Sequence, residues 1–363
     1  MTRGWLILGM ASLGAIGVAL LAAGTVCLTS GCSTIGYYAQ SVGGHLSLVR
    51  AAKPVAEWLA DPQTPTALKA RLELSQRIRD FAVSDLKEPD NASYRRYADL
   101  KRSAAVWNVV AAPELSLKLQ AWCFPIVGCV GYRGYYEQAE ATAFAEALKP
   151  LGLEVNVYGV PAYSTLGLLP GDGLKDPLLN TFIHYPEGEL ARLMFHELAH
   201  QIAFAKGDTV FNESFATAVE RIGGERWLRN HASPHARDEF ARYDARRRDF
   251  RELTARYRDR FEALYTSPAS DTDKRAGKAA LMIELRADYA AMKRERWGGH
   301  TGYDGWFARA NNASFGVLAA YNDLVPNFER LFEREGRDFT RFYDEVKRLA
   351  ALPPAERRKA LDL

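Results

Sequence analysis

The segment His196-Glu197-Leu198-Ala199-His200 carries the side chains best suited to metal-dependent chemistry in this chain. On a helix, a spacing of four residues places both imidazoles on one face, where they can chelate a single Zn²⁺ ion. Glu197 would then lie about 100° around the helix from His196, beside the metal without being a ligand, and able to take a proton from water. The pattern predicts a zinc site with Glu197 as the general base; the alternative is a buried structural histidine pair.

A catalytic zinc site needs a third protein ligand and an open position for water. The helix that carries the histidines has a natural stop at Gly207, where a left-handed C-cap fits, and a second helix begins near Asn212. Glu213, in the first turn of that second helix, can reach the metal if the two helices pack antiparallel. Glu213 is therefore a candidate for the third ligand beside His196 and His200.

The elements that must position these residues form an α-rich α+β protein. Short apolar, β-branched runs predict four strands, over residues 106–110, 126–132, 155–158 and 178–183, with a helix over 137–148 between the second and third. Strand, helix and strand in this order predict one right-handed crossover and a small mixed sheet.

Helices are expected on both sides of this core. Amphipathic or helix-forming segments cover 37–60, 67–86, 236–265, 273–297 and 313–351, and the third and fourth of these form a predicted helical hairpin. The chain then divides into an export signal over 1–31, an N-terminal helical region over 32–104, a core with the sheet and metal helices over 105–230, and a C-terminal helical region over 231–363.

The N-terminus predicts export. Arg3 precedes an uncharged stretch over 4–30, followed by Gly31-Cys32-Ser33, which resembles a signal peptide ending in a lipobox. In such proteins the cysteine, here Cys32, becomes the acylated first residue, and Ser33 resembles the pattern sorted to the outer membrane. The alternative is an uncleaved membrane anchor over 6–26. Either outcome predicts an exported protein held at the periplasmic face of a membrane.

Two further observations concern partners and redox state. Cys123 and Cys129 lie close together around Pro125 and Gly128, which in an oxidising compartment predicts a disulfide; two reduced, buried thiols are the alternative.

The net charge of +3 is small and the basic residues are scattered, so nucleic acid is not an expected partner.

The two metal motifs resemble the zinc aminopeptidases of the gluzincin clan, which pair HELAHQ with NEGFA; here the strings are HELAHQ from His196 and NESFA from Asn212. The resemblance implies a zincin-like fold for the core, Glu213 as third ligand, and Glu220 as the residue that orients a histidine ring. In the clan a tyrosine on a later helix stabilises the transition state. Its place corresponds here to Asn311 or Asn312, with Tyr303 and Tyr321 nearby, although Tyr321 is equally explained as a core residue.

The chain lacks the Gly-x-Met-Glu-Asn element with which that clan holds the substrate's amino terminus. The segment 162–167 lies where that edge strand would run. It is predicted to bind substrate backbone, with Tyr163 and Ser164 beside the scissile bond. Either another carboxylate binds the free amine, with Glu114 and Asp176 as candidates, or the enzyme is not an aminopeptidase.

Over nearly the whole length after Cys32, the sequence resembles a family of aminopeptidase-like zinc lipoproteins of Gram-negative bacteria. The resembling segments, besides the metal motifs, are 37–40, 106–109, 122–125, 129–134, 160–167, 311–313 and 321–326. This resemblance implies a zinc metallopeptidase acting on a peptide or peptide-like amide. The rival hypothesis is a zincin-fold lipoprotein, stabilised by zinc, that acts in binding or envelope assembly without turnover.

Overall fold

The computed structural model describes residues 32–124, 128–162, 171–320 and 324–362, and it divides the chain into two units, 1–48 and 49–363. The described part of the first unit belongs to helix α2 (Cys32–Ala51), which starts at the cysteine proposed for lipidation. The export signal over 1–31 lies outside the described residues. Within the described segments, no helix is both long enough and apolar enough to span a bilayer.

The predicted helix over 37–60 is divided in two. After α2 come the short strand β1 (Lys53–Pro54) and helix α3 (Val55–Ala60). Pro54 explains the break, because a proline has no N–H to donate and disfavours helical dihedrals in the residue before it. The second predicted helix is present as α4 (Thr66–Ser84).

The sheet of the core is centred on β3 (Val106–Pro113). Strands β6 (Arg133–Tyr135) and β7 (Leu153–Val160) both pair with it in antiparallel orientation. The predicted crossover helix is α5 (Gln138–Leu148), which connects β6 to β7. Strands β6 and β7, which the crossover connects, run parallel to each other but do not pair, because β3 lies between them. All pairings in this sheet are antiparallel, so the predicted mixed sheet is wrong here.

A second sheet of three strands is mixed. It contains β1, β2 (Arg96–Ala98) and β8 (Leu178–Leu179), with β2 and β8 parallel. The predicted strand over 126–132 is also different in the structure, where β5 (Gly128–Val130) forms a hairpin with β4 (Trp122–Phe124) before the chain enters β6.

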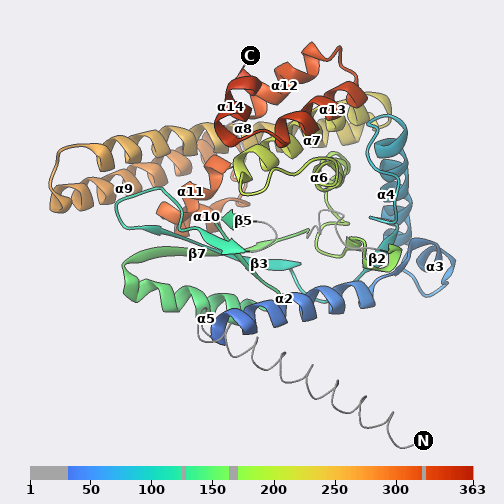
Figure 1. Cartoon of the computed structure of the whole chain (residues 1–363), viewed down its shortest axis with the longest axis horizontal. Helices are drawn as coiled ribbons and strands as arrows, with labels where there is room; N and C mark the ends of the chain where they lie inside the picture. The colour runs from blue at the N-terminus through green and yellow to red at the C-terminus, as the bar shows by residue number, and fades with distance from the viewer. Residues whose placement is uncertain (1–31, 125–127, 163–170, 321–323, 363) are drawn as a thin grey trace, which may run out of the picture. The chain divides into compact units, whose positions relative to one another are not determined.

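The rest of the described chain is helical. Helices α6 (Glu187–Ala199) and α7 (Thr209–Asn230) pack on each other. The predicted hairpin is confirmed as α8 (Pro234–Thr266) and α9 (Asp271–Arg296), which run side by side (Figure 1). The chain ends in α10 (Asp304–Arg309), α11 (Asn312–Ala320), α12 (Val325–Arg334), α13 (Phe339–Ala350) and α14 (Pro354–Asp362). The α-rich α+β class is confirmed, while the four-region division and the hand of the crossover stay predictions.

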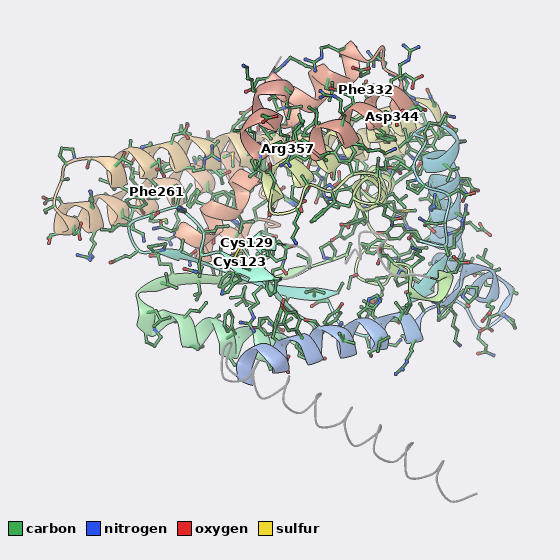
Figure 2. The ribbon with its side chains drawn as sticks, in the orientation of Figure 1. Cys123, Cys129, Phe261, Phe332, Asp344 and Arg357 are labelled. Carbon is green, nitrogen blue, oxygen red and sulfur yellow. A yellow bond between two sulfur atoms is a disulfide. The ribbon has the colours of Figure 1, made fainter. Side chains whose placement is uncertain are left out.

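Helix α6 lies in the protein interior. Leu190, Met194, Phe195 and Leu198 have no solvent exposure, and the partly exposed residues of the helix are Glu187, Leu193, His196 and Glu197. The α8–α9 hairpin has its own core, which includes the buried Phe261 labelled in Figure 2. A rigid, fully packed helix is the kind of support that a precise ligand set requires.

Candidate metal centre

His196, His200 and Glu213 come together where α6 meets α7. The Nε2 atoms of the two histidines are 3.2 Å apart, and Glu213 Oε2 lies 3.2 Å from His196 Nε2 and 3.7 Å from His200 Nε2. Among the described residues, this is the one group of three or more such side chains with ligand atoms close enough to share an ion. The predicted ligand set is therefore present as a cluster.

The dimensions of the cluster fit a small tetrahedral cation. Ligand atoms at about 2.0–2.1 Å from a zinc ion stand about 3.3 Å from one another at tetrahedral angles. The three separations measured here lie close to that value. Two ring nitrogens facing each other beside a carboxylate oxygen also need a cation or a proton between them, so the donor chemistry fits the metal as well.

Glu220 fixes the orientation of the His196 ring. Its Oε2 lies 3.0 Å from His196 Nδ1, and its Oε1 accepts a hydrogen bond of 2.6 Å from the Arg192 guanidinium. Burial opposes ionisation of Glu220, yet Arg192 and His196 hold the pKa of this carboxyl well below its usual range. An ionised Glu220 accepts the Nδ1 proton, which leaves the lone pair of His196 Nε2 directed at the ligand cluster.

Glu197 lies next to the cluster and is partly buried. Burial raises the pKa of its carboxyl above the ordinary value, against the opposing effect of His196 and His200. A carboxylate with a raised pKa beside a metal cluster can accept a proton and later return it. The position predicted from sequence is thus compatible with acid–base work.

The turn between α6 and α7 places Glu213. Helix α6 ends at Ala199, earlier than the predicted stop, and His200 is its C-cap residue, while Gly207 takes up left-handed dihedrals later in the turn. The side chain of Asn212 bonds to both backbone groups of Ala205, at 2.7 and 2.9 Å. The first turn of α7, which contains Glu213, is held against the preceding loop in this way.

Asp208 anchors the same turn from the other side. Its side chain caps α7 by accepting from the backbone N–H of Phe211. Arg357 and Arg358 of α14 each approach it at 2.6 Å, and Arg357 is buried under the C-terminal helices (Figure 2). The last helix of the chain therefore supports the loop that carries the third ligand, a relation that local sequence patterns do not indicate.

A second support acts next to His200. Gln201 bonds to Asn91 and to Ser93, at 2.7 and 3.1 Å. The loop that contains these two residues is held by Arg79, a fully buried arginine that donates to the carbonyls of Pro89, Asn91 and Ser93. The residue after the second histidine is thus tied to the N-terminal helices.

Two tyrosines near the cluster were missed by sequence reasoning. The phenol of Tyr94 is buried, and burial together with the nearby carboxylates of Glu197 and Asp176 raises its pKa well above the ordinary value. Tyr158, on β7, hydrogen-bonds with Asn108; burial, and more weakly the charge of Glu213, raise its pKa to about 12. Tyr158 ends a strand that the sequence predicts, but nothing local brings it within electrostatic range of Glu213, which lies more than fifty positions later.

Other predicted site residues have different surroundings. Asn311 donates to the carbonyl of Val155, and the fully buried Asn312 donates to the carbonyls of Pro113 and Glu114. Both amides are therefore engaged with the ends of β3 and β7. Tyr163, Ser164 and Tyr321 lie outside the described residues, as does most of the predicted strand over 162–167.

The remaining candidates are placed as follows. The carboxylate of Glu114 pairs with Arg275 of α9 at 2.9 Å and is half exposed. Asp176 is buried beside Tyr94, whose backbone N–H donates to the carbonyl of Asp176 at 2.7 Å. Tyr303 stacks on Phe250 in the hairpin core, with ring centres 4.7 Å apart.

The predicted disulfide is confirmed. Cys123 and Cys129 are bonded across the β4–β5 hairpin (Figure 2). At the end of this hairpin, a side chain on Gly128 would come within 3.1 Å of the backbone nitrogen of Gly207. The disulfide-bonded hairpin therefore packs directly on the turn that leads to α7 and Glu213.

Comparison with known proteins identifies one family. The model of a family described as "Putative aminopeptidase" matches residues 36–361, which is most of the chain and includes both metal helices. No curated protein and no solved structure gives a match.

Proposed function

The chain belongs to this aminopeptidase family, and from that premise we propose that it is a zinc-dependent peptidase. The observation that carries the proposal is the convergence of His196, His200 and Glu213 at separations suited to one tetrahedral ion. Glu197 beside them distinguishes this arrangement from a structural zinc site, which needs no additional acid or base. The zincin-like character of the core is part of the same proposal.

Each protein group then has a defined task. His196, His200 and Glu213 would hold the zinc ion, which would act as a Lewis acid toward the scissile carbonyl and make the attacking water more acidic. Glu197 takes the proton from the attacking water and delivers it to the leaving amine. Glu220 keeps the Nδ1 proton of His196 in place, so that Nε2 remains a ligand.

For the donor to the developing oxyanion, we propose Tyr158. Its high pKa keeps the phenol protonated at neutral pH, and it lies close enough to Glu213 for that carboxylate to affect its pKa. Asn311 and Asn312, which the resemblance suggests for this role, use their amides to hold the sheet. Tyr163 and Tyr321 stay candidates for substrate contact on the sequence argument alone.

Amino-terminal recognition is the finer part of the proposal. A free ammonium group requires a carboxylate near the cluster, and we favour Asp176 over Glu114, because the charges of Asp176 and Glu197 both act on the phenol of Tyr94 whereas Glu114 pairs with Arg275. We propose in addition that the protein is exported and lipidated at Cys32. The disulfide supports an oxidising compartment.

The test combines metal analysis with peptide hydrolysis by the full-length protein. We expect one equivalent of zinc in the wild type, loss of zinc in His200→Gln, and retained zinc with lost turnover in Glu197→Gln. A peptide library with free and acetylated amino termini then reports the mode of cleavage. If Glu197→Gln cleaves peptides as fast as the wild type, any observed activity does not come from this site.

A further inference from the structure

A second feature of the molecule is a basic hollow of about 820 Å³, lined by residues of α6, α7, α8 and α12. These helices contact one another around α7 (Figure 1). The volume is in the range of about 300–1,000 Å³ that is common for small-molecule sites. The three candidate zinc ligands are not among its lining residues, so the hollow is separate from the metal cluster.

The lining of the hollow has an excess of positive charge. Six arginines and three carboxylates line it. The oxygen atoms of these three carboxylates lie 3.4 to 3.7 Å from the nitrogen atoms of the lining arginines with which they pair. Ion pairs of that length at a surface neutralise charge incompletely and hold side chains weakly.

Two of these arginines have no acidic partner. In the described part of the chain, the Arg251 guanidinium makes no hydrogen bond and no ion pair, and the Arg237 guanidinium donates only to backbone carbonyls. Burial and the positive charge of neighbouring Arg221 lower the pKa of Arg251. The hollow therefore gathers cations that repel each other, an arrangement that an anionic ligand would stabilise.

A third arginine, Arg192, has a buried N–H group without a hydrogen-bond acceptor within the described segments. Arg192 is 5% exposed, lines the hollow and uses two of its nitrogens on Glu220 and Asp244. Its Nε–H is buried and has no acceptor among the described residues. A buried donor without a partner is costly, so this side chain indicates an acceptor that a ligand would provide.

We propose that this hollow binds a ligand through its phosphate group, with Arg192, Arg237 and Arg251 as the main contacts. A phosphate monoester offers three acceptor oxygens and close to two negative charges, which match the two arginines without acidic partners and the free Nε–H of the third. A carboxylate has one charge and two oxygens, and would leave part of this set unsatisfied. The phosphate can belong to a soluble compound or to a phospholipid headgroup.

The experiment is a ³¹P NMR titration of the zinc-loaded full-length protein in uncharged detergent. The two probes are inorganic phosphate and dihexanoyl phosphatidic acid, with dihexanoyl phosphatidylcholine as the lipid that lacks a monoester. The test variant is Arg237→Gln/Arg251→Gln. Its matched control is Arg242→Gln/Arg256→Gln, which removes the same charge from exposed positions of α8 that do not line the hollow.

We expect saturable binding to the wild type and to the control variant, and binding weakened at least tenfold in the test variant. Within the described residues, the Arg251 guanidinium has no hydrogen-bond or ion-pair partner and Arg237 bonds only to two carbonyls, so the test variant should keep the circular dichroism spectrum of the wild type. Tighter binding of phosphatidic acid than of phosphate supports the lipid source, and equal binding supports a soluble one. Equal affinity of wild type and test variant, or no saturable binding of either probe, overturns the proposal.

Discussion

Replacing Glu220 by glutamine tests how the protein controls its metal cluster. The change keeps the size of the side chain and an acceptor oxygen for His196 Nδ1, but it removes the charge that holds both His196 and Arg192. The carboxylate is 17% exposed and its Arg192 partner 6%, so solvent does little to screen this interaction. The variant therefore isolates the electrostatic contribution of one residue behind the metal ligand.

The expected loss is tenfold to a hundredfold in zinc affinity. This is the usual effect of removing a carboxylate that orients a ligating histidine, and it corresponds to about 1.4–2.7 kcal/mol of binding free energy. The loss should stay in this range, because all three ligands remain and glutamine still accepts one hydrogen bond. Replacement by alanine should cost more, since it also leaves the buried Arg192 without its main partner.

Competition against a fluorescent zinc chelator measures the affinity directly. The control is Glu225→Gln, on the same helix, where the carboxylate is 75% exposed and pairs with Arg229 at 3.5 Å. That variant should bind zinc as the wild type does. If Glu220→Gln also binds zinc within twofold of the wild type, then Glu220 does not set the basicity of His196, and the cluster is organised by the ligands alone.

Three further results are expected. Glu197→Gln should keep its zinc and lose about 10²- to 10⁴-fold in kcat, measured on a peptide that the wild type cleaves. Arg357→Met should lower the free energy of unfolding by about 3–5 kcal/mol in urea titrations, because it breaks a buried ion pair with Asp208, and it should also weaken zinc binding. Serine at both Cys123 and Cys129 should cost about 2 kcal/mol, the value for a loop of this length, with little change in zinc affinity.

The sequence predicts the metal ligands better than it predicts the fold around them. Histidines four apart on a helix share a face whatever surrounds them, so His196 and His200 could be paired from local geometry alone. Glu213 was assigned through the resemblance of its motif to that of the zinc aminopeptidases, and it can reach the metal because two consecutive helices pack on each other. The disulfide followed from two cysteines close together in the chain.

The parts that the sequence did not predict depend on contacts between distant segments. Nothing near Arg357 indicates that α14 supports the turn before α7. The phenol of Tyr94 comes within electrostatic range of Glu197 only because the loop after α4 folds back, with Tyr94 in left-handed dihedrals that a tyrosine rarely adopts. The strand order β6-β3-β7 also depends on which strands meet in space, which alternating hydrophobicity does not specify.

Arg192 belongs both to the metal centre and to the basic hollow, and this has a thermodynamic consequence. Its guanidinium holds Glu220, which holds His196, while the same residue lines the hollow and has a buried Nε–H without an acceptor among the described residues. A phosphate that draws Arg192 toward the hollow weakens its bond to Glu220, and one that fixes it in place strengthens that bond. Linkage requires that whatever factor phosphate imposes on zinc affinity, zinc imposes on phosphate affinity. The zinc affinity should therefore be measured with and without phosphate, and the phosphate affinity with and without zinc. The two ratios must be equal, and unequal ratios would show that the two measurements do not report on the same two sites.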